Sequence, residues 1–284
     1  MLLVLDPVPA LARDLRTLPP ALAQPLFVEA IRPLRGLTHT ADGAWEAYRD
    51  GRCFPSEVRA IERALTQRFA GEAEYGRLVS LGLAHTGRPA LSTVVLTAAD
   101  AGEEAAVLQA FWQILARSQK SDLRLVTYGG ARWGLPFLAR RSLLLGLAPS
   151  VPLPLGRSKL EVHFDVDAVL ANWDVRRSRP LELAALQYDL PGPWATSEDP
   201  DGADTTAAIR TALDAGDREG ARALAEARLQ ALVGLHARHG AELPRRRGVT
   251  PLVRWRPLPQ DVSGTPHGHG GLHRAGGERS PCRR

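Results

Sequence analysis

Acidic side chains near the ends of predicted strands are the residues of this sequence best suited to metal or acid–base chemistry. Asp6 directly follows the apolar run Met1–Leu5, and Asp165 and Asp167 lie two residues apart in the segment 162–173, VHFDVDAVLANW. Carboxylate oxygens are the ligands that Mg²⁺ and Mn²⁺ prefer, and several of them must converge to hold such an ion. An aspartate at the start of a helix can equally serve as an N-cap, which requires no catalysis. These positions therefore predict either a metal site or helix caps.

Histidines and cysteines give weaker signals. The three histidines His267, His269 and His273 lie in a glycine-rich tract, and such a pattern binds a transition metal only where a fold surrounds it. The two cysteines, Cys53 and Cys282, can form neither a disulfide framework nor a CxxC zinc site. We therefore expect reduced thiols and a cytoplasmic protein.

The segment Leu123–Leu147 predicts the unit around which the fold is organised. Its first residues, up to Tyr128, are apolar or β-branched and indicate a short buried strand. Gly129 and Gly130 then predict a tight turn. The apolar and basic residues from Pro136 onward indicate an amphipathic helix, with the proline in its first turn. Ligands of α/β sheets collect where strands end in such turns.

Periodicity predicts further elements along the chain. Strands are expected at Met1–Leu5, Tyr75–Ala84 and Pro89–Thr97, and helices at Ser56–Phe69, Glu103–Arg117, Thr205–Leu213 and Asp217–His239. Pro7 should end the first strand because it lacks an N–H group. His85–Arg88 predicts the turn of a hairpin. Residues 9–74 are expected to form a helical insertion packed on the sheet.

Length and charge limit the classes of protein. With 284 residues and 44% hydrophobic residues, the chain can bury one substantial core. No segment approaches the roughly 20 apolar residues of a membrane span, and the first residues do not read as a secretory signal. The net charge of the chain is +5, and residues 241–284 carry nine arginines and three acids, a charge of +6, so residues 1–240 are close to neutral. Such a basic Gly/Pro/Arg-rich tail is typically disordered, although it could also contact phosphates.

The glycine turn also resembles a known motif. The predicted 3′-5′ exonucleases related to the proofreading exonuclease domain of family B DNA polymerases have a block that reads approximately L-V-T-F-N-G-x-x-F-D-L-P. The positions that match here, in order, are Leu125, Val126, Thr127, Tyr128, Gly130, Leu135 and Pro136. Trp133 occupies the aromatic position of the block, and His163–Asp165 resembles the family's H-x-D block. The resemblance covers residues 1–6 and 75–240.

The resemblance implies the RNase H-like fold of the DEDD exonucleases. We therefore expect an α/β domain over residues 1–240, with a mixed five-stranded sheet flanked by helices, the insertion at about 9–74 and the tail at 241–284. The family hydrolyses phosphodiesters with two divalent ions, Mg²⁺ or Mn²⁺, about 4 Å apart.

Most of the family's metal-binding positions are replaced in this chain. Asp6 matches the first aspartate, whereas the other motif positions are occupied by Val8, Gly134, Leu224 and Arg228. A single carboxylate cannot hold two hydrated dications. We therefore hypothesise that the Arg228 guanidinium lies near Asp6 and replaces the charge of the metal with an ion pair. The alternative is that Arg228 lies on the solvated surface.

Three functions remain open. The first is a pseudoenzyme without metal cofactor that binds single-stranded DNA or RNA through Arg132, Arg140, Arg141 and the tail. The second is a divergent, active 3′-5′ exonuclease that uses Mg²⁺ or Mn²⁺ and recruits Asp165, Asp167 or Asp204. The third is a protein-interaction module with no role in nucleic-acid binding. None of the three predicts contact with a membrane.

Overall fold

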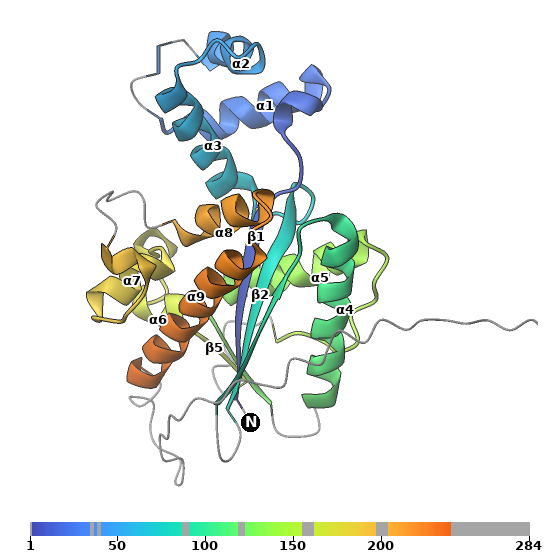
Figure 1. Cartoon of the computed structure of the whole chain (residues 1–284), viewed down its shortest axis with the longest axis vertical. Helices are drawn as coiled ribbons and strands as arrows, with labels where there is room; N and C mark the ends of the chain where they lie inside the picture. The colour runs from blue at the N-terminus through green and yellow to red at the C-terminus, as the bar shows by residue number, and fades with distance from the viewer. Residues whose placement is uncertain are drawn as a thin grey trace, which may run out of the picture.

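A computed structural model of the chain describes residues 2–34, 37–38, 41–86, 91–118, 123–154, 162–196 and 204–239. It shows an α/β protein built on one mixed five-stranded sheet (Figure 1). The strands are β1 (Leu2–Leu11), β2 (Gly76–Thr86), β3 (Leu91–Thr97), β4 (Arg124–Thr127) and β5 (His163–Asp165), in the order β3-β2-β1-β4-β5. β1 pairs antiparallel with β2 and parallel with β4, and β5 pairs parallel with β4.

Helices cover both faces of the sheet. The helices α4 (Ala101–Ser118) and α5 (Leu135–Leu144) lie against one face, and α6 (Val166–Leu170), α7 (Leu181–Gln187), α8 (Thr205–Asp214) and α9 (Arg218–His239) lie against the other (Figure 1). The alternation along β1 produces these two cores, because successive side chains of a strand point to opposite faces. Leu3 and Leu5 pack with α4 and α5, whereas Val4 and Val8 pack with α8 and α9. Asp6 thus faces the side of the sheet that α9 covers.

Periodicity predicted the hairpin and the long helices correctly. The predicted strands at 75–84 and 89–97 are β2 and β3, and the predicted helix at 103–117 is α4. The turn was placed too early, because His85 belongs to β2 and lies opposite both Leu3 and Ser92. Residues 87–90, including the rest of the expected turn, lie outside the described residues.

The first strand continues beyond Pro7, contrary to our prediction. Within β1, only Leu2–Leu5 pair with β4. The part of β1 that follows therefore has β2 on one side and no ladder partner on the other. A proline on such an edge removes no ladder hydrogen bond. The register with β2 shifts between Val8 and Pro9. β1 thereby extends to Leu11 and carries Asp6 in the middle of a strand.

The insertion extends from one end of the sheet and does not pack on its face as expected (Figure 1). It consists of the short 3₁₀ turn η1 (Leu15–Thr17) and the helices α1 (Pro20–Ile31), α2 (Ala41–Arg49) and α3 (Pro55–Phe69). Its helices bury a core of their own, in which the ring of Phe27 lies 5.3 Å from the rings of both Trp45 and Tyr48. Burying an aromatic side chain contributes about 1.5–3 kcal/mol. The insertion therefore does not need the sheet to cover its apolar side chains. The tail at 241–284 lies outside the described residues.

Candidate functional site

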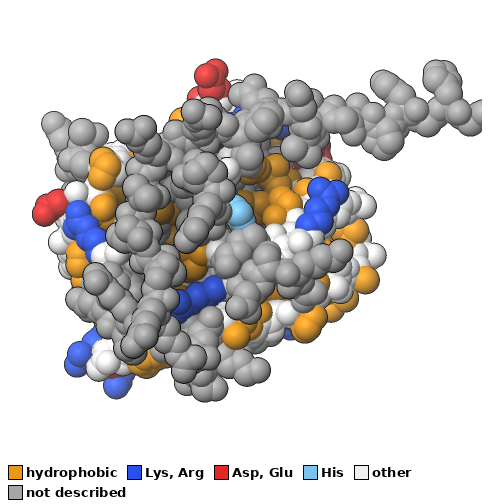
Figure 2. Space-filling view, turned by 90° about the horizontal axis from the view of Figure 1, so that it is seen from below, with side chains coloured by type: hydrophobic (Ala, Val, Ile, Leu, Met, Phe, Trp, Pro, Cys, Tyr) orange, Lys and Arg blue, Asp and Glu red, His pale blue; other side chains and the backbone are white. Residues whose placement is uncertain are grey.

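The carboxyl ends of the parallel strands meet at the end of the sheet that faces the insertion. In this register Thr127 lies opposite both Leu5 and Asp165. A cleft of about 1340 Å³ opens there, lined by residues of β1, the insertion, α5, and α7 to α9. The opposite end of the molecule shows mostly hydrophobic and uncharged side chains between the grey segments (Figure 2). The cleft is therefore the candidate site.

Arg228 lines this cleft and forms an ion pair with the buried Asp6, as hypothesised from the sequence. The Arg228 Nε lies 3.1 Å from Oδ2 of Asp6, and Nη2 lies 3.3 Å from Oδ1. The Nη1 group donates to Glu182 and, at 2.9 Å, to the hydroxyl of Thr205. The Thr205 hydroxyl in turn donates to Glu182. The alternative of a solvated Arg228 is wrong, since this residue is only 7% exposed.

Burial makes the charges of this network interdependent. Burial raises the pKa of Asp6 above its usual range, and the Arg228 guanidinium offsets only part of this effect. Burial disfavours the charged form of Arg228, but the carboxylates of Asp6 and Glu182 outweigh it and raise the pKa of the guanidinium. Arg228 therefore stays charged, with two carboxylates around it. A buried charge needs such partners, because removing one of them leaves the other uncompensated.

The other three family positions contribute no carboxylate. Val8 is fully buried in the core beneath α9, and Leu224 packs against the same core. Gly134 lies against β1, where a Cβ atom would stand 3.2 Å from Cγ of Pro7. An aspartate at position 134 would thus press on Pro7. These residues do not fit the ligand set of a two-metal centre.

Asp165 was predicted as a weak metal ligand or as a helix cap, and the structure gives it a different role. Its carboxylate accepts hydrogen bonds from the backbone N–H groups of Gly129 and Ala131, both at 2.8 Å. It makes no side-chain hydrogen bond to the first turn of α6, so the prediction of a cap on its own helix was wrong. Asp165 instead fixes the glycine turn after β4, where Gly129 has a φ of 69°. Asp165 therefore has a structural role in holding this turn.

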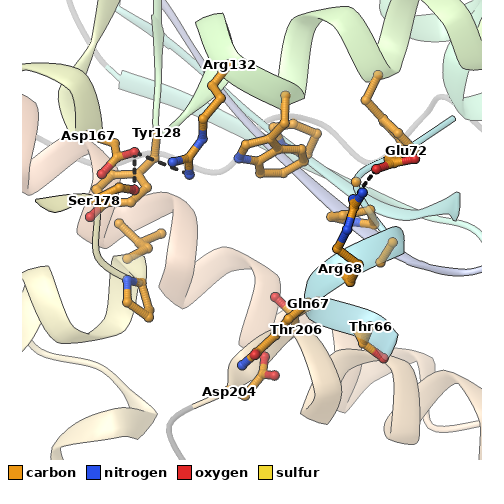
Figure 3. A pocket seen from close by; sticks show the side chains of 18 of the residues that line it. Thr66, Gln67, Arg68, Glu72, Tyr128, Arg132, Asp167, Ser178, Asp204 and Thr206 are labelled. Atoms are coloured by element: carbon orange, nitrogen blue, oxygen red, sulfur yellow. Dashed lines mark hydrogen bonds and ion pairs between the residues drawn. The ribbon is translucent and has the colours of Figure 1, made fainter. Parts of the chain in front are cut away.

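The remaining acids proposed as replacement ligands are also engaged. Asp167 accepts from the hydroxyl of Ser178 at 2.6 Å and lies 3.7 Å from the guanidinium of Arg132 (Figure 3). Asp204 accepts from the backbone N–H of Ala207 and caps α8. Within the described part of the chain, no group of three or more His, Cys, Asp or Glu side chains could hold a metal ion.

The structure brings two of the three predicted nucleic-acid-binding arginines to the cleft. Arg132 and Arg140 line it, with side chains 48% and 66% exposed. Arg140 also pairs with Glu74 at 2.5 Å. Arg141 does not line the cleft: its half-buried guanidinium binds the fully buried carboxylate of Glu104, at 2.8 Å for both contacts. Arg141 therefore joins α5 to α4 and is not available at the site.

Glu182 and Thr205 are the site residues that sequence reasoning missed. They reach Arg228 from α7 and α8, at sequence separations of 46 and 23 residues. Neither residue belongs to a motif with a fixed spacing, and an acid on an amphipathic helix usually points to solvent. Their burial, at 5% and 4% exposure, is visible only in the folded chain.

Comparisons with known proteins leave the family open. No family model matches the chain, and no curated protein matches its sequence. The described helices include none that is long and apolar enough to cross a membrane.

Proposed function

We propose that this protein is a non-catalytic relative of the 3′-5′ exonucleases, with an RNase H-like fold, that binds single-stranded nucleic acid in its cleft. The observation that carries the proposal is the Asp6–Arg228 ion pair in the position where the family resemblance expects metal ions. The sheet supports the fold assignment, because its first strand is central, with an antiparallel hairpin on one side and parallel strands on the other.

The ion pair accounts for the absence of catalysis in electrostatic terms. Two-metal hydrolysis needs several carboxylates converging on two dications. Here Asp6 and Glu182 already surround a fixed positive charge, and both bind it through hydrogen bonds. A dication at Asp6 would have to displace the guanidinium or lie next to it, and two like charges repel strongly at such short distance. We therefore expect no phosphodiester hydrolysis.

The cleft retains features suited to a single strand. Tyr128 and Trp133 line it together with Arg132 and Arg140. Guanidinium groups bind phosphates in a bidentate way, and aromatic side chains stack on unpaired bases. The partners of both arginines are exposed or distant, since Arg132 lies 3.7 Å from Asp167 and Glu74 is 42% exposed. Such pairs are weak and exchange readily for a phosphate.

Replacement of both cleft arginines tests this proposal. The double variant Arg132→Ser/Arg140→Ser should bind a fluorescent single-stranded DNA or RNA oligonucleotide several-fold more weakly. The plot of log K against log salt concentration should become shallower by about 1.4, because two phosphate contacts are lost at about 0.7 each. Fluorescence anisotropy across a salt series measures both quantities, with Mg²⁺ or Mn²⁺ added to detect any shortening of the strand.

The matched control is Arg49→Ser/Arg52→Ser. These exposed arginines share Asp50 as their partner and do not line the cleft. The control should bind as the wild type does. If the wild-type protein binds neither the DNA nor the RNA oligonucleotide, nucleic-acid binding is refuted. Metal-dependent shortening of the strand would refute the loss of catalysis.

A further inference from the structure

The connection between α6 and α7, Ala171–Pro180, combines exposed cations with an exposed aromatic ring. Its sequence is ANWDVRRSRP, with three arginines and one acid. Trp173 is 44% exposed, although a tryptophan is usually largely buried. Asn172 and Trp173 have φ values of 50° and 62°, which residues other than glycine seldom adopt. Strained backbone of this kind persists where the surroundings enforce it, and it collects at binding sites.

The surrounding structure holds this connection firmly. The Tyr128 hydroxyl donates to the backbone oxygen of Arg179 at 2.9 Å, and the Ser178 hydroxyl donates to Asp167 at 2.6 Å. The backbone N–H of Trp173 donates to Ala168 at 2.8 Å. Two of the three anchors, Tyr128 and Asp167, line the cleft. Both of these anchors hold the C-terminal end of the connection, Ser178 and Arg179, at the rim of the cleft, whereas Trp173 is held to α6.

The arginines of the connection are accessible. The side chains of Arg176 and Arg177 are 88% and 71% exposed, and their partner is Asp174, at 3.1 and 3.7 Å. Exposed ion pairs contribute little to stability, so a phosphate can replace the aspartate. Arg179 is exposed as well, and it lines the cleft.

The cleft itself lacks a strong positive charge. Six arginines and five acids line it, so its walls alone attract a polyanion weakly. The connection at its rim carries a net charge of +2 within ten residues. The connection thus has a higher net positive charge than the residues that line the cleft, and a polyanion entering the cleft would be attracted to this rim.

We propose that Ala171–Pro180 is a second contact for single-stranded nucleic acid, with an unpaired base stacked on Trp173 and phosphates bound by Arg176, Arg177 and Arg179. This inference rests on the proposed function and adds a site outside the family motifs. A single strand is favoured over a duplex, because only unpaired bases offer a free face to an indole ring. It is favoured over an acidic peptide, because guanidinium groups and one exposed aromatic ring match alternating phosphates and bases.

Three variants test the two halves of this site. Trp173→Ala should weaken binding of a labelled single-stranded oligonucleotide by roughly tenfold, and Trp173→Phe should restore most of the loss, since a phenyl ring still stacks on a base. Arg176→Ser/Arg177→Ser should make the salt dependence shallower by about 1.4, as expected for two lost phosphate contacts. Arg49→Ser/Arg52→Ser is again the matched control, because two exposed arginines share one aspartate there as well. Circular dichroism melting curves verify that each variant is folded.

The outcomes separate the two proposals. If the wild type binds the oligonucleotide and the Arg132/Arg140 variant weakens it, but the Trp173 and Arg176/Arg177 variants bind like wild type, only the second contact is refuted. If the wild type binds no oligonucleotide, the proposed function itself falls. Trp173-dependent binding to vesicles of anionic lipid without oligonucleotide binding would assign this rim to a membrane surface and would also overturn the inference.

Discussion

Replacement of Arg228 by methionine is expected to lower the free energy of unfolding by about 3–5 kcal/mol at neutral pH. The methionine fills part of the volume but leaves the buried carboxylates of Asp6 and Glu182 without their cation. The energetic loss therefore comes mainly from uncompensated charge. Urea unfolding of the variant and the wild type measures it.

The loss should depend on pH in a defined direction. Burial already raises the pKa of Asp6, and removal of the guanidinium raises it further because the opposing interaction is lost. A carboxyl group whose pKa is higher in the folded state binds its proton more tightly there, so acid favours the folded variant. The stability difference from wild type is thus full above the folded-state pKa and shrinks as the pH falls through it. We expect a smaller difference at about pH 5 than at about pH 7.5.

Two further variants serve as controls for this prediction. Adding Asp6→Asn to Arg228→Met should restore part of the stability and make the pH dependence weaker, because one of the two buried carboxylates without a cation is removed. Arg210→Met on α8 should change little, since Arg210 forms a distant pair with the exposed Asp214 at 3.9 Å. A loss below about 1 kcal/mol that does not vary with pH would contradict a buried ion-pair network.

Replacement of Gly129 by alanine should destabilise the protein by about 3 kcal/mol, from two separate causes. Gly129 has a φ of 69°, which disfavours any residue with a Cβ atom. A Cβ atom at this position would also lie 2.6 Å from Nε1 of Trp133, which is shorter than any normal contact. The turn after β4 and the wall of the cleft would both have to shift.

Gly146→Ala is the matched control for the turn. Gly146 has a φ of 74°, but a Cβ atom there meets nothing within 4 Å. Its replacement should therefore have only the conformational effect, about 1 kcal/mol. Thermal and urea unfolding of both variants measure the difference. Equal effects of the two replacements would show that Trp133 does not pack over the glycine turn.

Local patterns predicted the parts of the fold that depend on neighbours in sequence. Alternation and helical period are local properties, so β2, β3, α4 and α9 could be recognised from the chain alone. The end of β1 could not, because whether Pro7 breaks a strand depends on where β4 stops pairing. The placement of the insertion could not either, because its aromatic core assembles from three helices that the sequence does not show to be mutual partners.

The candidate site also contains residues that the sequence indicated and residues that it did not. The contact between Asp6 and Arg228 was predicted because the motif positions fixed both residues, although they lie 222 positions apart. Glu182 and Thr205 complete the same network without any motif to indicate them. Arg141 was predicted to bind nucleic acid at the cleft together with Arg132 and Arg140. However, the side chains of neighbouring helix residues point in directions about 100° apart. Arg141 therefore points away from the cleft, and its guanidinium binds Glu104.

A crystal structure of the full chain grown with Mn²⁺ and examined by anomalous scattering tests most directly whether a guanidinium has replaced the metal centre. We expect Arg228 to remain bound to Asp6 and Glu182, with no anomalous peak within coordination distance of the Asp6 carboxylate. One or two manganese ions bound through Asp6, with Arg228 displaced, would contradict this arrangement.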